Sequence, residues 1–230
     1  MHDKNHHLRV IEEEIMETLF DLSIGDSVNR IKMKNILNRL GETITKAQLT
    51  NIVRRKLESE DYVDYVPYEG IILRPKGFEV ARKIARNHRL AEAMLYNIFD
   101  VPFDKLHDLA CQLEHAITDE TAEYINKKLL ELNVRTTPFG MPIPMNNLDD
   151  LGCDDEELIS IPPGTHVTLT RVQSHTSDTA ASLMDLNIHK MGIKLFIKSK
   201  NEEGILVENQ DSQFLIPNKI SKSLCVKRNP

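Results

Sequence analysis

Histidine, cysteine and glutamate recur at helical spacing in two stretches near the middle of the chain. His88 and Glu92 are four residues apart, so in a helix their side chains project from one face. Three further donors also follow one another at intervals of four: His107, Cys111 and His115. Glu114, three residues past Cys111, adds a carboxylate to this second set. We therefore expect six metal-ligand side chains on two neighbouring helices.

This mixture of nitrogen, oxygen and sulfur donors indicates a divalent transition metal. Imidazole, carboxylate and thiolate together suit Fe(II), Co(II), Ni(II) or Zn(II), whereas a thiolate makes Mg²⁺ and Ca²⁺ poor candidates. The chain has neither the Cys-x-x-Cys pairs of a structural zinc finger nor the His-Glu-x-x-His of a metalloprotease. A lone helical histidine is more often a surface or core group, and it is the number of donors that favours a metal site. We expect no catalysis from these residues, and hence not an enzyme.

The donors require helices, and the apolar spacing predicts them over residues 76–99, 104–117 and 119–133. Upstream, helices are expected over about 8–22, 28–40 and 45–59, with Thr45 as the N-cap of the third. Two β-like runs, 62–66 and 71–74, flank the turn 67–70 and predict a hairpin. Three helices followed by a hairpin outline a winged helix-turn-helix.

The predicted third helix has a basic, polar outer face. The segment 27–56 contains eight basic residues against one acid, Glu42, although the whole chain has a net charge of -6. With the apolar stripe of the helix buried, the outward residues that we expect to contact DNA are Lys46, Gln48, Thr50, Asn51, Arg54 and Arg55. Asn and Gln read adenine and Thr meets the thymine methyl group, while Lys and Arg suit phosphates.

Beyond residue 135 helical periodicity ends and prolines and acids accumulate, which indicates a linker. Four short β-like runs then predict a small barrel, at 167–172, 195–197, 205–207 and 214–216. The expected fold is mainly α (α+β), in domains 1–75, 76–148 and 165–230, with the linker at 149–164. No run reaches the roughly 18 apolar residues of a membrane helix and no signal peptide is present, so we expect a cytoplasmic protein without a membrane partner.

Three segments resemble the diphtheria toxin repressor and iron-dependent regulator family of metal-dependent transcriptional repressors. They are NHRLAE at 87–92, LHDLACQLEH at 106–115 and TTPFGMPIP at 136–144. The resemblance covers nearly the whole chain and is strongest over residues 76–145. It implies an N-terminal winged helix-turn-helix, a central helical dimerisation and metal-binding domain, and a C-terminal SH3-like domain.

The resemblance also divides the donors between two sites. It assigns His88, Glu92 and His107 to an ancillary metal site. It assigns Cys111, Glu114 and His115 to a primary, regulatory site, which is completed from the first helix.

The first-helix ligand departs from the pattern of the iron regulators. Those proteins have a methionine where this chain has Glu14, and Met16 is two positions away. Manganese-sensing relatives have carboxylates where this chain has Glu14 and Glu17, yet they replace the cysteine with glutamate. We therefore expect Glu14 and Glu17 at the primary site.

The SH3-like domain of the iron regulators lends two ligands to the ancillary site, and the alignment places Thr176 and Thr179 there. Both are weak ligands, with Asp178 or His175 as substitutes after a small change of register.

The sequence thus predicts a homodimer that represses transcription by binding double-stranded operator DNA when a divalent metal, with Fe(II) favoured, is bound. A manganese-responsive repressor of the same family is the first alternative, and Co(II), Ni(II) and Zn(II) are further candidates. A winged-helix regulator whose central domain does not sense metal is the second alternative, and a metal-dependent enzyme the third.

Overall fold

The structure is a computed structural model, and it describes residues 10–24, 29–41, 44–145, 154–173, 176–210 and 212–229 of the 230-residue chain. These residues form two compact units, and each is considered by itself. The first runs to Arg86 and also takes in Pro144 and Met145. The second holds Asn87–Ile143 and the described residues from 154 onward. The compact units are two, and the three domains expected from the sequence remain a prediction.

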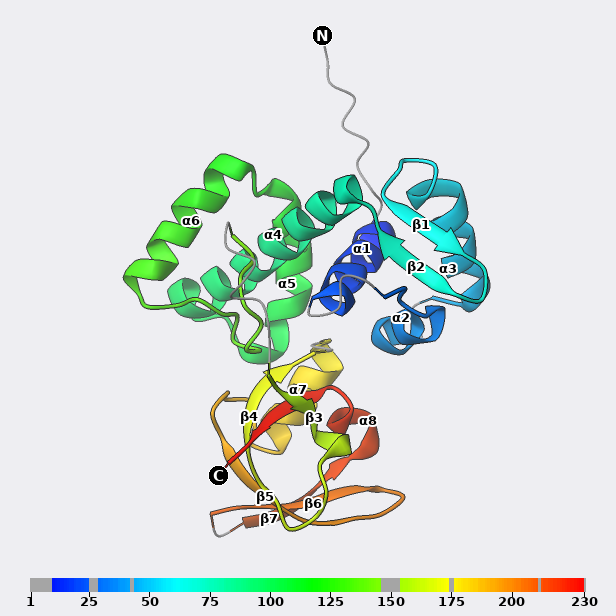
Figure 1. The fold of residues 1–230 in the computed structure, drawn as a ribbon. Helices are drawn as coiled ribbons and strands as arrows, with labels where there is room; N and C mark the ends of the chain where they lie inside the picture. The colour runs from blue at the N-terminus through cyan, green and yellow to red at the C-terminus, as the bar shows by residue number, and fades with distance from the viewer. Residues whose placement is uncertain are drawn as a thin grey trace. The chain divides into compact units, whose positions relative to one another are not determined.

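The first unit contains three short helices and a two-stranded hairpin, drawn from blue to cyan in Figure 1. The elements are α1 (Val10–Ser23), α2 (Met33–Leu40), α3 (Lys46–Ile52), β1 (Val63–Val66), β2 (Gly70–Leu73) and the first half of α4 (Pro75–Phe99). Its core joins Ile15, Leu19 and Phe20 of α1 to Leu49 of α3, all fully buried. This core holds α3 with its polar side outward.

The start of α3 is capped as the sequence predicts. Thr45 accepts a hydrogen bond from the backbone N–H of Gln48 at 3.3 Å, and the Gln48 side-chain oxygen accepts the Thr45 backbone N–H at 2.9 Å. This reciprocal pair is a capping box. The helix continues beyond Ile52 as a π-helical turn, Val53–Leu57, which carries Arg54 and Arg55.

The expected second helix, over 28–40, begins later than predicted, at Met33. Ile31 instead pairs with Ile71 of β2, since the backbone N–H of each donates to the carbonyl of the other at 2.7 and 2.9 Å. Gly70 permits this approach, because a Cβ there would collide with the Ile31 carbonyl. Ile31 therefore pairs with the hairpin as a single residue beside β2. Residue 28 and Gly25, the expected end of the first helix, lie outside the described residues.

The helical part of the second unit contains the rest of α4, α5 (Leu106–Leu113) and α6 (Asp119–Glu131). The continuous helix predicted over 104–117 is broken. A 3₁₀ turn at Phe103–Lys105 precedes α5 and another at Glu114–Ala116 follows it. His107 and Cys111 therefore lie on α5, whereas Glu114 and His115 lie on the turn after it, where the four-residue helical interval no longer applies.

The C-terminal part is a six-stranded antiparallel sheet, drawn from yellow-green to red in Figure 1. The strands are β3 (Glu156–Glu157), β4 (His166–Val172), β5 (Lys194–Lys200), β6 (Gly204–Asn209), β7 (Ser212–Pro217) and β8 (Leu224–Arg228), in the order β3-β8-β4-β5-β6-β7. The four predicted β-like runs are confirmed within β4 to β7. Two helices, α7 (Ser177–Asp185) and α8 (Asn218–Ser221), and the strands β3 and β8 were not anticipated.

The segment just after α6 is anchored to this sheet. Phe139 is fully buried in the core that β4 and β5 help to form, and its carbonyl accepts the backbone N–H of Val172 at 2.8 Å. Gly140 lies so close to β4 that a Cβ would collide with the Thr170 carbonyl. The Phe103 ring stacks at a tilt on Phe139, with 4.4 Å between ring centroids. The helical part and the sheet of this unit thus share one core.

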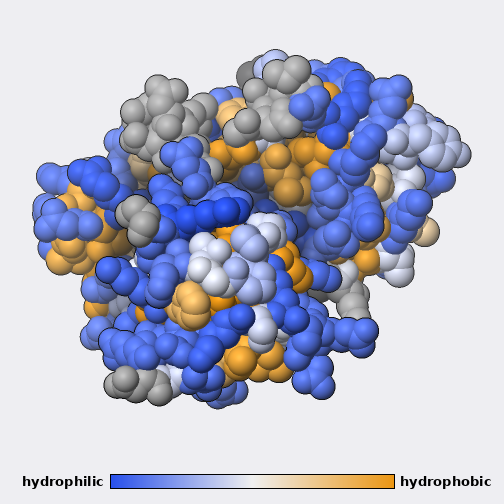
Figure 2. Space-filling model, turned by 60° about the horizontal axis from the view of Figure 1, so that its bottom comes forward, coloured by the Kyte–Doolittle hydropathy of each residue, from blue (hydrophilic) through white to orange (hydrophobic). Residues whose placement is uncertain are grey.

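Hydrophilic residues predominate on the face drawn in Figure 2, with small hydrophobic areas between them. Among the helices in the described part of the chain, none combines the length and hydrophobicity that crossing a bilayer requires.

Candidate metal centre and nucleic-acid interface

The six predicted donors of the second unit form one connected cluster. His88 and Glu92 come from α4, His107 and Cys111 from α5, and Glu114 and His115 from the turn that follows. The resemblance divides them into two sites, yet contacts cross that division, as described below. The cluster is built entirely within the second unit.

His88 lies at the centre of the cluster and is 1% exposed. Its Nδ1 is 2.7 Å from Oε2 of Glu114, and its Nε2 is 3.1 Å from Oε1 of Glu92. Both carboxylates are buried, with Glu92 fully so. Buried carboxylates require compensating charge or hydrogen bonds, and this ring supplies both of them with a partner.

Cys111 is in contact with two imidazoles. Its Sγ lies 3.9 Å from Nδ1 of His88 and 3.7 Å from Nε2 of His107. The donor atoms of these three residues all lie within 4.8 Å of one another. Two imidazoles and a thiol in such proximity are a fitting donor set for a divalent transition metal.

The contact between Cys111 and His107 shifts the pKa of both side chains. Burial raises the pKa of the Cys111 thiol, but its contacts with His107 and His88 outweigh burial and the net pKa is lowered. Burial likewise lowers the pKa of His107, and the contact with Cys111 outweighs it, so that pKa is raised. A lowered thiol pKa favours the thiolate, which is the form that binds metal.

The turn that carries Glu114 and His115 is held by a residue that the sequence did not single out. Asn87 Nδ2 donates to the carbonyl of Ile117 at 2.7 Å and to that of Glu114 at 3.4 Å. Asn87 precedes His88, but nothing in its local sequence indicates a partner thirty residues away. His115 is the most exposed donor, at 42% of its side chain, and its Nε2 is 4.0 Å from Oε1 of Glu114.

The remaining predicted ligands lie elsewhere in the chain. Glu14 and Glu17 are on α1 of the first unit, so their part in the site stays a prediction. Met16 is fully buried in the core of that unit. Thr176 is the N-cap of α7, and its hydroxyl accepts the backbone N–H of Thr179, so both are engaged at the helix start. His175 lies outside the described residues.

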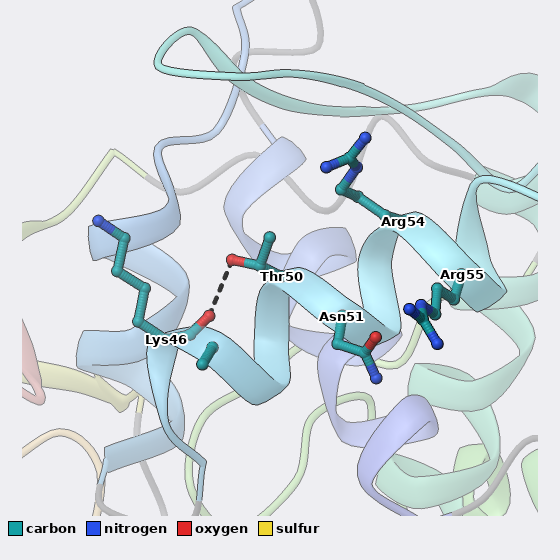
Figure 3. A pocket seen from close by; sticks show the side chains of 6 residues that line it. Lys46, Thr50, Asn51, Arg54 and Arg55 are labelled. Atoms are coloured by element: carbon teal, nitrogen blue, oxygen red, sulfur yellow. Dashed lines mark hydrogen bonds between the residues drawn. The ribbon is translucent and has the colours of Figure 1, made fainter.

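The outer face of α3 lines a surface pocket in the first unit. Figure 3 shows Lys46, Thr50 and Arg54 along one side of the helix and Asn51 and Arg55 along the other, and Ala47 also lines the pocket. The Thr50 hydroxyl donates to the Lys46 carbonyl at 2.8 Å. All six predicted DNA contacts, Gln48 included, are thus on the exposed part of one helix, five of them around this pocket.

Gln48 also takes part in the N-terminal cap of α3, a role that its outward position on the predicted helix did not indicate. It is exposed, but its side-chain oxygen accepts hydrogen bonds from the Thr45 N–H and hydroxyl, the latter at 2.7 Å. The side-chain NH₂ is the group left to face a base. Arg30, counted in the basic segment, is ion-paired with Asp64 of β1, which keeps the pKa of that carboxyl below its ordinary value and removes this arginine from the free basic surface.

A winged helix with a basic outer helix face occurs in this chain together with a buried cluster of His, Cys and Glu donors. This is the combination of features that a metal-binding, DNA-binding regulator requires. Residues 74–145 match the model of the family described as "Iron dependent repressor, metal binding and dimerisation domain". The diphtheria toxin repressor of Corynebacterium diphtheriae is 30% identical over 156 residues, which are 67% of this chain and 64% of that protein.

Solved structures have the same fold. The structure of T. acidophilum IdeR matches with a TM-score of 0.75 over 97% of this chain and 100% of that chain, at 22% identity. The manganese regulator SloR matches with a TM-score of 0.75 over 95% and 98%, also at 22% identity. These matches show that the chain is similar to metal-dependent repressors, among them the diphtheria toxin repressor and the iron-dependent repressor IdeR. The predicted fold class, with an SH3-like C-terminal domain, is confirmed, although the sheet pairings of the described residues do not include a closing pair between β3 and β7.

Proposed function

We propose that this chain is a divalent-metal-dependent transcriptional repressor, which binds double-stranded operator DNA as a homodimer when metal is bound. The observation that carries the proposal is the donor cluster around His88. The same chain also has a helix, α3, with an N-terminal capping box and a basic outer face. Similarity to metal-dependent repressors supports a regulator and gives no support to an enzyme. Because its target is DNA, such a repressor would act in the cytoplasm.

The metal would be held by the buried cluster. Its donors are His88, Glu92, His107, Cys111, Glu114 and His115. From the family resemblance we also propose carboxylates of the first helix, Glu14 and Glu17. The ion would supply positive charge among buried carboxylates and a partner for the thiolate.

Fe(II) is the metal that we propose, with Mn(II) as the alternative. The half-buried thiol of Cys111 favours Fe(II), and also accepts Co(II), Ni(II) or Zn(II), because thiolates select softer ions than Mn(II). Glu14 and Glu17 favour Mn(II). Relatives of both kinds exist, since IdeR is named an iron-dependent repressor and SloR a manganese regulator.

The DNA contacts that we propose are on α3 and its π-helical extension. Lys46, Arg54 and Arg55 would meet phosphates, which position the protein and make affinity depend on salt. Asn51, Gln48 and Thr50 would face base edges in the major groove. A dimer would present two such helices to successive major grooves, roughly 34 Å apart.

The helical part of the second unit offers the surface for dimerisation. Its exposed large hydrophobic residues are Phe99, Leu109, Tyr124, Leu130 and Leu132. Exposed apolar side chains in number mark interaction surfaces. The matching family model is itself described as a dimerisation domain.

Metal and DNA would act on each other through a shared preference for one conformation. A metal ion that binds the DNA-competent conformer more tightly shifts the population toward it. By linkage, DNA must then tighten metal binding by the same factor, typically ~5-fold to 150-fold.

Fluorescence anisotropy of labelled DNA from the region upstream of the gene tests this function. We expect tight binding with one or more of Fe(II), Mn(II), Co(II), Ni(II) and Zn(II), and loss of it with chelator. The series ranks the metals, and a matching rise in metal affinity when DNA is present checks the linkage. DNA affinity that is equal in every metal and in chelator would contradict the proposal.

A further inference from the structure

One face of the C-terminal sheet has two lysines on either side of a threonine. Thr168 of β4 is paired in register with Lys194 of β5 and, on its other side, with Lys227 of β8. Residues directly opposite each other in antiparallel strands point their side chains to the same face. Neighbouring strands lie about 4.8 Å apart, so the Cα atoms of the two lysines are separated by two strand spacings, or about 10 Å.

This row lies on the side of the sheet away from the core. Val167 and Leu169, the neighbours of Thr168 along β4, are fully buried in the core of this unit. Side chains alternate between the two faces of a strand, so Thr168 and both lysines lie on the opposite, outer face. Lys194 and Lys227 are exposed, and neither amine has an ion pair or a hydrogen bond with any residue that the structure describes.

The other lysines and arginines of the described strands already have partners. Each donates to an acceptor of the same unit: Lys198 to Glu208, Lys200 to the Ile159 carbonyl, Arg171 to Asp155 and Arg228 to Glu156. Asp155 uses both of its oxygens for Arg171, at 2.7 and 2.9 Å. The positive charge that remains for an external partner is therefore concentrated beside Thr168.

An oriented amide lies next to the two lysines. The Thr168 hydroxyl donates to Oδ1 of Asn229 at 2.7 Å, and the backbone N–H of Asn229 donates to the His166 carbonyl at 2.9 Å. With its oxygen engaged in this way, the Asn229 amide retains two N–H donors for another acceptor. Lysine ammonium groups and asparagine amides are among the groups with which proteins contact DNA phosphates.

We propose that the outer face formed by Lys194, Thr168, Lys227 and Asn229 binds the phosphate backbone of duplex DNA. This inference rests on the proposed DNA-binding function and adds a contact surface outside α3. The two lysines would meet separate phosphates, and Nδ2 of Asn229 would donate to a phosphate oxygen. Thr168 is a positioning residue, because it holds the amide.

The charge of the whole chain favours DNA as the occupant of this face. Because the net charge is -6, attraction to a polyanion must come from local groups of unpaired cations. Two ammonium groups on strands about 10 Å apart suit an extended polyanion, and duplex DNA carries one charge per about 1.7 Å of its axis. Backbone contacts carry no sequence information, so this face would strengthen binding without selecting the operator.

Salt titrations of DNA binding test the two lysines. Anisotropy would be measured with metal and a duplex of the upstream region at several salt concentrations. We expect Lys194→Gln and Lys227→Gln each to reduce the slope of log affinity against log salt by about 0.9, the value for one phosphate contact. Lys198→Gln is the matched control, because Lys198 is on the same strand as Lys194 but is paired with Glu208. We expect it to leave the slope unchanged.

Asn229→Asp tests the amide without a change of size. A carboxylate oxygen would replace the N–H donor beside the phosphate, and we expect the affinity for the duplex to fall by about tenfold. Circular dichroism of each variant separates a loss of DNA binding from a loss of folding.

Lysine acetylation of the full chain, measured by mass spectrometry with and without DNA, gives the position of the contact directly. We expect DNA to protect Lys194 and Lys227, whereas Lys219, exposed on α8, should react equally in both states. Two results would overturn the inference: equal reactivity of Lys194 and Lys227 with and without DNA, or the same change of salt slope in Lys198→Gln as in Lys194→Gln.

The proposed function and this inference fail separately. If DNA binding requires metal but the two lysines contribute nothing, only this inference is wrong. If DNA protects the two lysines but binding ignores metal, the proposed metal control is wrong and this DNA contact stands.

Discussion

His107 and Cys111 set the pH range over which the cluster is ready for metal. The raised pKa of His107 means that a proton occupies this ring to a higher pH than the ordinary value of 6.5. The lowered pKa of Cys111 means that the thiolate persists to a lower pH than usual. Since a ligand must be deprotonated before it binds metal, protonation of His107 opposes metal binding as the pH falls.

We therefore expect metal affinity to fall as the pH is lowered through the pKa of His107. A competition titration with Zn(II) and a coloured chelator, between pH about 6 and 8, measures this. His107→Ala should bind more weakly and lose much of the pH dependence. An affinity that is the same across this range in the wild type would count against the proton competition.

The contacts of individual side chains also show which features of the site could not be predicted from the sequence. The four-residue spacing of His88 and Glu92 predicted their shared face, and they are indeed in contact at 3.1 Å. The contact of His88 with Glu114 joins residues 26 positions apart, so it depends on how α4 packs against the end of α5. His115 was assigned by a helical interval that the 3₁₀ turn interrupts. Periodicity identified the donors but not their partners.

At the scale of elements, the proposed recognition helix, α3 with its π-helical extension, depends on its N-terminal cap. Thr45 and Gln48 satisfy each other's backbone N–H groups at the start of a helix of only seven residues. Short helices have little stability of their own. The cap therefore contributes to holding Lys46 to Arg55 in place.

Thr45→Ala is expected to lower the free energy of unfolding by about 1 kcal/mol and to weaken DNA binding. Thermal unfolding and anisotropy with metal present measure the two effects. Thr118→Ala is the matched control, because Thr118 forms a second capping box, with Thr121 at the start of α6. An equal loss of DNA binding in both variants would show that general stability, and not the recognition helix, is responsible.

Residues on the two sides of α3 are expected to affect DNA binding differently. Arg54→Ala should weaken binding to all sequences alike and reduce the slope of log affinity against log salt by about 1. Asn51→Ala should instead cost about 1 to 3 kcal/mol on the operator and little on unrelated DNA. Anisotropy titrations on both DNAs at several salt concentrations measure this, and identical salt slopes and sequence losses in the two variants would refute the division.

The winged helix was predictable because caps, turns and apolar stripes are local signals, as Thr45 shows. What the sequence did not reveal depends on distant pairing. Ile31 leaves the expected helix because Ile71 of β2 offers it two backbone hydrogen bonds. The helix α7 is only nine residues long, with its apolar residues Ala180 and Leu183 buried against the sheet core, and its short pattern resembled a loop.

At the scale of the whole molecule, the repression that we propose requires two copies of the chain. Phe99 is 63% and Leu109 40% exposed, on α4 and α5 of the part that matches a dimerisation domain. A charge at either position would have to be desolvated in a dimer interface. Within one copy of the chain, both side chains are partly exposed to solvent.

Phe99→Arg and Leu109→Arg are therefore expected to yield monomers that fold normally but bind DNA at least about tenfold more weakly. Light scattering coupled to size exclusion gives the mass, and circular dichroism the fold. Met184→Arg is the control, since Met184 is 39% exposed on α7, outside the residues 74–145 that match the dimerisation domain. A dimer that persists in both variants would place the interface elsewhere.

We propose that metal bound at the Cys111 cluster controls DNA binding, and a DNA-retardation titration with the upstream region tests this control. Wild type and Cys111→Ala would be compared with Fe(II), with Mn(II) and with chelator, keeping Met184→Arg as a surface control. We expect a retarded complex with metal in the wild type, none with chelator, and a loss of the complex in Cys111→Ala but not in Met184→Arg. Retardation that ignores both the chelator and the Cys111 substitution would leave a DNA-binding protein and contradict metal control.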